Sequence, residues 1–151
     1  MPITIDVRVS ARARPALPGA AAARLARAVL RAEGVREAMV SIAFVGRQAI
    51  RTLNRRHLGH DRATDVIAFG LTPPARARSP RRPIIGDIYV CAPVGAAQAR
   101  RFHTTAREEL RRLVVHGVLH VLGYDHPAGE RRAASPMWRR QEALLSRLGG
   151  R

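Results

Sequence analysis

TAREELRRLVVHGVLHVLGYDH (residues 105–126) combines a long apolar helix pattern with three histidines. Thr105 and Glu108 have the spacing of a capping box, so they predict the start of a helix. Apolar residues then fill most positions up to Leu122, and Gly123 can take the left-handed conformation that ends a helix. Because a helix that is apolar on most sides is buried, we expect this segment to be the core helix of the fold.

The histidine spacing in this stretch predicts a metal site. On a helix, His116 and His120 lie about 40° apart around the axis and about 6 Å apart along it, so both rings project from one face. Gly123 lets the chain turn back toward that face, which brings His126 to the same point. Three imidazoles on a tetrahedral zinc leave its fourth position open, as in catalytic sites. We therefore expect one zinc per chain, bound by His116, His120 and His126.

The same spacing has the skeleton of the metzincin protease motif H-E-x-x-H-x-x-G-x-x-H, with one difference. Gly117 stands at the position of the glutamate. In the proteases this glutamate is the general base that activates water for attack on an amide. We therefore expect a chemistry other than peptide hydrolysis and rank a metallopeptidase last.

Charge is the strongest feature of the composition. The 151 residues include 27 Lys+Arg against 11 Asp+Glu, for a formal net charge of +16. All of the basic residues are arginine, whose planar fork binds phosphate oxygens in pairs and stacks on bases. The composition predicts a nucleic-acid partner, with a solvated basic surface as the alternative.

Length and cysteine content indicate a protein of the cytoplasm. A chain of this length can bury a core without help from a metal. The single cysteine, Cys91, cannot form an intramolecular disulfide, and MPITIDVRVS lacks the features of a signal peptide. No apolar run approaches the roughly 18 residues that a membrane helix requires. We expect a cytoplasmic protein with no membrane partner.

Strand and helix patterns alternate along the first part of the chain, and helix patterns fill the last part. The strand patterns fall at residues 3–9, 38–45, 64–71 and 83–91. The helix patterns fall at residues 20–34, 47–58, 92–102, 105–122 and 135–148. Between two strands, the Pro- and Arg-rich stretch 72–82 predicts a loop that is either solvated or in contact with RNA. The order suggests one layered domain over residues 1–151, α+β or α/β. We assign it to α+β, with a mixed sheet of about four strands, about five helices and the metal-binding helix in the core.

Three further stretches of the sequence carry patterns that occur together with such a histidine motif in one protein family. LNRRHLGHDRATDVIAF (53–69) is built around an L-N pair, an aspartate and T-D-V-x-x-F, and IGDIYV (85–90) contains G-D-I. Met137 and Glu142 fall near an M-x-x-x-E spacing, with one extra residue between them. Together with HGVLHVLGYDH, these stretches resemble the YbeY family of bacterial rRNA maturation factors and endoribonucleases.

The resemblance covers most of residues 45–145 and implies a function. It implies a zinc-dependent, single-strand-specific endoribonuclease that acts in small-subunit rRNA 3′-end processing, ribosome maturation and quality control. The implied partners are single-stranded RNA, rRNA and the small ribosomal subunit. The family's metal ligands map onto His116, His120 and His126.

One departure from the family pattern concerns activity. Many members have an arginine implicated in activity shortly after the L-N pair, where this chain has Leu58. Arg55 and Arg56 are near but out of register, and Ala63 replaces a common proline. A non-enzymatic assembly factor, in which zinc organises an RNA-binding surface, therefore stays as the alternative function.

RNA hydrolysis also needs a proton shuttle. Zinc can make water nucleophilic and polarise a phosphoryl oxygen, but Gly117 cannot act as a base. The candidate shuttles are hydroxide at the metal or the side chains of Asp125, His60 and Asp61. Asp125 equally suits a role as an acceptor that orients a ligand histidine.

Candidate RNA contacts follow the L-N pair. We assign them to Asn54, Arg55 and Arg56, with a helix-end role as the alternative for Asn54. Asp65 and Asp87 stand at strand starts, and we interpret them as turn or cap residues rather than catalytic groups.

Overall fold

The computed structural model describes residues 2–71, 83–126 and 134–149, and a single mixed sheet organises them. Its strands are β1 (Ile3–Val9), β2 (Ala38–Val45), β3 (Val66–Gly70) and β4 (Ile84–Cys91), in the order β1-β2-β4-β3. β1, β2 and β4 run parallel, and β3 pairs antiparallel with β4 at the edge. The predicted four-stranded mixed sheet is confirmed. The predicted loop 72–82 lies outside the described residues.

Alternating side chains give the sheet its two faces. Along β2, Val40, Ile42 and Phe44 are buried, and the residues between them are half-buried. Because successive side chains of a strand point to opposite faces, these three face one layer of helices. Ile42 lies beside Ile88 of β4, which is also fully buried, so the core runs through the middle of the parallel strands.

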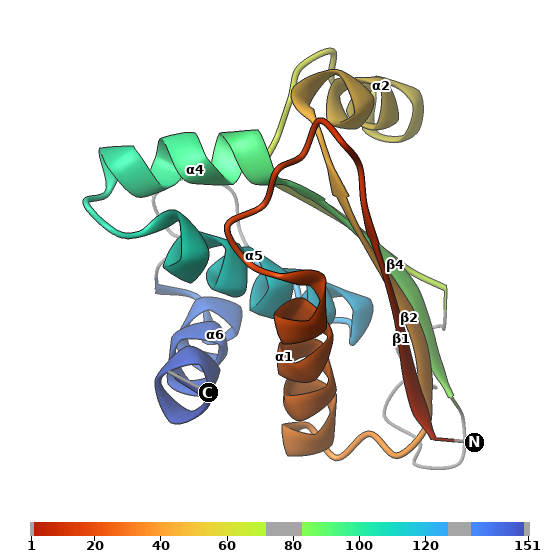
Figure 1. Cartoon of the computed structure of the whole chain (residues 1–151). Helices are drawn as coiled ribbons and strands as arrows, with labels where there is room; N and C mark the ends of the chain where they lie inside the picture. Colours follow the sequence, from red (N-terminus) through yellow and green to blue (C-terminus); the bar gives the residue numbers. More distant parts are fainter. Residues whose placement is uncertain (1, 72–82, 127–133, 150–151) are drawn as a thin grey trace.

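The described residues form the helices α1 (Gly19–Ala32), α2 (Arg47–Leu58), α4 (Ala92–Arg101), α5 (Ala106–Val121) and α6 (Pro136–Arg147). Figure 1 shows α1, α4, α5 and α6 on one side of the sheet and α2 at one end of it. A second small cluster of Ile50, Ile67 and Cys91 joins α2 to the sheet. The predicted α+β class and its helices are confirmed, and no described helix is long and apolar enough to cross a membrane.

Two glycines let α5 lie very close to β4. A Cβ on Gly117 would come within 2.6 Å of Ile88 Cγ2, and a Cβ on Gly86 within 2.5 Å of Val121 Cγ1. Real side chains do not tolerate such distances without a shift of the backbone or of the neighbouring side chain. α5 is therefore seated on the sheet through backbone-to-side-chain contact, with nearly all of its residues buried.

Candidate metal centre

The start of α5 is fixed by its cap. Thr105 Oγ1 accepts a hydrogen bond of 3.0 Å from the backbone N–H of Glu108, the first half of the predicted capping box. Acidic residues in the first turn, Glu108 and Glu109, suit the positive end of the helix dipole. The helix then carries His116 and His120 on one face, with His116 buried and His120 half-buried.

The end of α5 turns the chain toward that face. Gly123 has φ of +98°, a conformation that favours glycine. The N–H of Gly123 bonds to the carbonyl of His120 at 2.9 Å, and the N–H of Tyr124 bonds to the carbonyl of Leu119 at 3.0 Å. This pair of bonds is a Schellman motif. The turn that the sequence predicts at Gly123 is therefore present.

Three histidines converge as a result. The ring centroids of His116 and His120 are 4.7 Å apart, and each lies 5.0 Å from the ring of His126. One nitrogen from each ring can be chosen so that all three lie within 4.8 Å of one another. Nitrogens about 2.0–2.1 Å from a common ion would lie about 3.3–3.5 Å apart in a tetrahedral site. The group is thus close enough to hold a metal ion after small rotations of the rings.

His116 is held by a chain of hydrogen-bonded side chains that the sequence patterns do not reveal. Gln141 of α6 is 1% exposed, and its Oε1 lies 2.7 Å from Nδ1 of His116. Gln141 Nε2 donates to Glu142 Oε2 at 3.1 Å. Arg112 of α5 in turn donates to both carboxylate oxygens of Glu142, at 2.9 and 3.1 Å. The interaction passes from Arg112 through Glu142 and Gln141 to the histidine.

This contact corrects the register of one motif. The match of Met137 and Glu142 to M-x-x-x-E needs one extra residue, but the residue four positions after Met137 is Gln141. The side chain that bonds His116 therefore occupies the glutamate position of the pattern and is an amide. The signal in the sequence was the uninterrupted spacing itself, which a helix without an insertion preserves.

The pKa of Glu142 reflects its surroundings. Burial acts to raise the pKa of this carboxyl, but hydrogen bonds from Arg112 and Gln141 outweigh it, so the pKa lies below the ordinary value. The carboxylate form therefore persists beside the amide, and it can only accept hydrogen bonds.

The turn that carries His126 is tied down by Tyr124. Its hydroxyl donates to Glu33 Oε1 of the segment after α1 at 2.7 Å, and Arg140 of α6 donates to Glu33 Oε2 at 3.0 Å. The ring packs against the main core. Tyr124 therefore anchors the turn between α5 and His126.

The predicted catalytic candidates lie in different places. Asp125 is exposed, and its Oδ1 accepts from the backbone N–H of His126 at 2.8 Å, so it fixes the backbone of a candidate ligand. Asp61 makes a paired contact with Arg51, with N–O distances of 2.9 and 3.2 Å. The Arg51 hydrogen bond lowers the pKa of Asp61. His60 is exposed, and neither it nor Asp61 belongs to the histidine group found among the described residues.

The predicted RNA contacts divide into two kinds. Asn54 is 3% exposed, and its Nδ2 donates to the carbonyl of Arg62 at 3.0 Å. It holds the loop after α2, in agreement with the helix-end alternative. Arg55 and Arg56 are exposed in the last turn of α2. Leu58, at the position of the family arginine, is 51% exposed at the end of the same helix.

Asp65 and Asp87 both accept hydrogen bonds. Asp65 Oδ1 accepts from the N–H of Val66 at 2.8 Å, and its Oδ2 accepts from Gln98 at 3.2 Å. Asp87 accepts from Ser41 of the neighbouring strand at 2.6 Å. The contacts of Asp65 agree with a turn or cap role. The interpretation of Asp87 as a turn or cap residue at a strand start is wrong, because Asp87 lies inside β4 and bonds across to β2.

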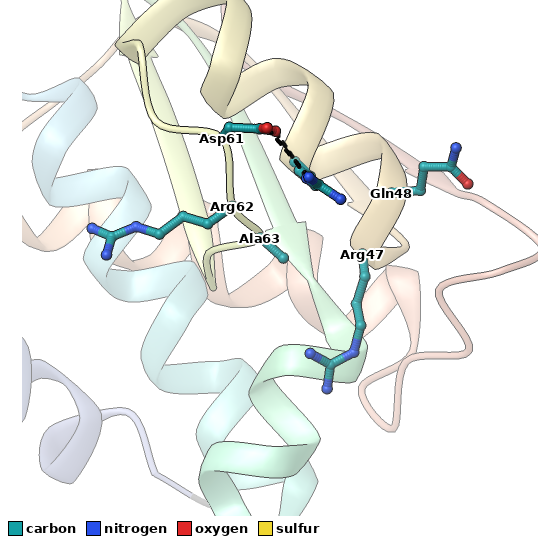
Figure 2. Close-up of a pocket in the computed structure, with 6 residues that line it drawn as sticks. Arg47, Gln48, Asp61, Arg62 and Ala63 are labelled. Atoms are coloured by element: carbon teal, nitrogen blue, oxygen red, sulfur yellow. Dashed lines mark hydrogen bonds and ion pairs between the residues drawn. The ribbon is translucent and has the colours of Figure 1, made fainter.

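An open pocket lies beside α2. Its lining residues are Arg47, Gln48, Arg51, Asp61, Arg62 and Ala63. Figure 2 shows that the side chains of Arg47 and Arg62 point away from Asp61. Asp61 is paired with Arg51, and Arg47 and Arg62 are exposed.

The chain is thus an α+β domain in which two histidines of a buried helix and a third after the following turn form a group that could hold a metal ion. The family model described as "Endoribonuclease YbeY" matches residues 13–149. The chain belongs to the YbeY family.

Curated relatives carry the same description. The chain is 42% identical over 127 residues to "Endoribonuclease YbeY" of Anaeromyxobacter sp., an alignment that covers 83% of this chain and 62% of the relative. It is 40% identical over 132 residues to that of Moorella thermoacetica, covering 83% of each. With that of Stenotrophomonas maltophilia it shares 34% over 150 residues, covering 98% of this chain and 92% of the relative.

A solved structure supports the fold. The solution structure of a Thermotoga maritima protein matches with a TM-score of 0.61 and 27% identity, covering 95% of this chain and 87% of that one. The likeness extends over nearly the whole chain.

Proposed function

We propose that this chain is a zinc-dependent endoribonuclease that cleaves single-stranded RNA. We propose further that it acts in the cytoplasm in small-subunit rRNA 3′-end processing, ribosome maturation and quality control. The observation that carries the proposal is the convergence of His116, His120 and His126 in a chain whose curated relatives are described as endoribonucleases.

The residues of the site fit zinc. Imidazole nitrogen is a preferred zinc ligand, and three such ligands leave a position for substrate. His120 and His126 are half-buried, so one side of the group is open to solvent. When bound, zinc supplies Lewis acidity, which makes water nucleophilic near neutral pH and polarises a phosphoryl oxygen.

The chain's own groups have to move the proton. Asp61 is a poor base because its ion pair with Arg51 lowers its pKa. Asp125 adjoins His126 in sequence and keeps an exposed carboxylate. Asp125 is therefore the leading candidate for the shuttle, and it combines this role with holding the backbone of His126.

Arginines near α2 supply the phosphate contacts. Arg47 and Arg62 line the open pocket, and Arg55 and Arg56 are exposed at the other end of the helix. A guanidinium binds phosphate oxygens through paired hydrogen bonds. This region therefore suits the backbone of a single RNA strand.

Gly117 weakens the peptidase alternative further. Its Cα faces Ile88 of β4 in the core, so a glutamate here would point into packed apolar side chains rather than toward the histidines. The packing gives this position a structural reason to be glycine.

A second candidate function is a non-enzymatic ribosome assembly factor. The observation that favours it is Leu58, which places an exposed apolar side chain where the family resemblance has an arginine implicated in activity. In that case zinc would organise an RNA-binding surface and no cleavage would occur.

Cleavage assays separate the two. Protein purified without a His tag and loaded with zinc should cleave single-stranded RNA faster than duplex RNA of the same sequence. A chelator, or His126→Ala, should abolish cleavage while retaining most of the arginine-driven RNA binding. Equal, negligible cleavage by the wild type and His126→Ala would reject the enzyme and favour the assembly factor. Unchanged metal content in His120→Ala would reject the proposed ligands.

A further inference from the structure

Gln141 is a fully buried amide in contact with a candidate metal ligand. Its side chain is 1% exposed, and it comes from α6, 25 residues after His116. A buried amide must satisfy both its oxygen and its NH2 group. The partners of the two ends therefore decide which way the amide faces.

Glu142 decides the orientation. An ionised carboxylate can only accept, so the amide nitrogen of Gln141 faces Glu142 Oε2 at 3.1 Å. Turning the amide over would place two oxygens against each other at that distance. Arg112 holds Glu142 with two hydrogen bonds and keeps the carboxylate in place.

The orientation of the amide fixes the histidine. Gln141 Oε1 can only accept, so at 2.7 Å the Nδ1 of His116 must carry the proton and donate it. The lone pair of the neutral ring is then on Nε2. A hydrogen bond from the second ring nitrogen of this kind sets which nitrogen binds a metal.

We propose that Gln141 is a positioning residue of the metal centre. It fixes the tautomer and the ring orientation of His116, and Arg112 and Glu142 fix the orientation of its amide. The inference rests on the proposed metal centre and assigns a role to the amide that occupies the glutamate position of M-x-x-x-E. The carboxylate of the motif has in effect moved one residue along α6 and acts through Gln141.

Metal affinity tests the role. In competition with a chromophoric chelator, Gln141→Leu should bind zinc about 10–100-fold more weakly than the wild type, the usual effect of removing such a partner. Gln98→Leu is the matched control, because the Gln98 amide is half-buried and donates to Asp65 without touching a histidine. The control should retain wild-type affinity.

Two conservative variants distinguish positioning from simple packing. Gln141→Glu combined with Glu142→Gln exchanges the two side chains, so a carboxylate oxygen still accepts from Nδ1 and the new amide at position 142 can donate to the other oxygen. This double variant should restore affinity to the wild-type level or above. Glu142→Gln alone should lower affinity, because an amide at this position no longer dictates which way Gln141 faces. A double variant as weak as Gln141→Leu would overturn the inference.

Nitrogen NMR of the metal-free protein provides a readout that needs no metal. The His116 ring should be protonated on Nδ1 in the wild type and lose that preference in Gln141→Leu. Protonation on Nε2 in the wild type would overturn the inference even if zinc binds. A wild type that binds no zinc but carries the proton on Nδ1 would reject the proposed function. It would still support the role of Gln141 in setting the tautomer of His116.

Discussion

Leu58 offers the sharpest residue-scale test of activity. Its side chain is 51% exposed, so an arginine fits there without disturbing the core. If the family arginine stabilises charge on the phosphorane, Leu58→Arg should raise the cleavage rate by up to about 10²–10³-fold, as one added donor to a developing oxyanion can. Single-turnover cleavage of a short single-stranded RNA measures the change.

Leu71→Arg is the control for added charge. Leu71 is 60% exposed and directly follows β3, so this variant gains the same charge elsewhere. An equal rise in both variants would show that the gain comes from RNA attraction and not from the position of the guanidinium.

A substitution at Gly117 tests how closely α5 packs against β4. Gly117→Ala places a methyl group 2.6 Å from Ile88 Cγ2. We expect a net loss of about 1–3 kcal/mol in the free energy of unfolding, because overpacking outweighs the better helix propensity of alanine. Denaturant unfolding of the metal-free protein measures this loss.

The double variant with Ile88→Ala isolates the cause. Without Ile88 Cγ2 the added methyl group has room, so Gly117→Ala should cost little or nothing in that background. The same loss in both backgrounds would place the strain elsewhere and contradict the close approach of α5 to β4.

At the scale of elements, charges on the first half of α5 make stability depend on pH. Glu109 is 7% exposed, and burial raises its pKa above the ordinary 4.5, with Arg112 offsetting part of the effect. The folded state then binds the proton more tightly than the unfolded state. The contribution of Glu109 to the free energy of unfolding is therefore fully present below a pH of about 4.5. It is lost as the pH rises through the raised pKa.

Glu109→Gln should remove this loss. At pH 7 the variant should unfold at a higher denaturant concentration than the wild type, and its advantage should shrink as the pH falls toward 4.5. Unfolding midpoints across this range measure it. Glu108→Gln is the control: its carboxylate is more exposed and accepts from Arg111 at 3.0 Å, so its loss should not stabilise the protein. A pH-independent advantage would assign the gain to something other than the Glu109 proton.

The sequence predicted the individual helices, strands and turns better than it predicted the contacts between them. The strand of β2, the helix α2, the Thr105 cap and the Gly123 turn follow from local periodicity and capping, and the structure confirms them. The same local geometry brought the three histidines together, since two share a helix face and the third follows one tight turn.

Contacts across the fold were beyond local patterns. The pairing of β3 on the edge beside β4 depends on tertiary packing. Gln141 reaches His116 from another helix, and the tight fit of Gly117 depends on where α5 meets β4. A pattern within one segment does not encode which side chain of another segment it will meet.

In the molecule as a whole, the arginines carry more positive charge than the acidic side chains can neutralise. The chain has 27 arginines and 11 acids. Six of the acids are already engaged in ion pairs with arginine in the part of the chain that the structure describes: Asp6, Glu33, Asp61, Glu108, Glu109 and Glu142. The remaining positive charge has to be balanced by counterions or by a polyanion.

Binding of RNA should therefore depend steeply on salt. On a single strand the logarithm of the association constant falls with the logarithm of salt concentration by about 0.7 for each phosphate contacted. If Arg47 and Arg62 each contact one phosphate, removing both as Arg47→Gln and Arg62→Gln should reduce the slope by about 1.4. Fluorescence anisotropy with a labelled single strand at several salt concentrations measures the slope.

The pair Arg24→Gln and Arg36→Gln provides the control for net charge, since both residues are exposed and lie on and beyond α1 rather than in the pocket. Long-range attraction alone would lower affinity equally in the two double variants, because each loses two positive charges. If the pocket binds phosphate directly, the double variant of Arg47 and Arg62 should lose more of the salt slope than the double variant of Arg24 and Arg36. Equal slopes in the two pairs would reject the pocket as a phosphate site, and a flat salt response of the wild type would reject RNA binding through phosphates altogether.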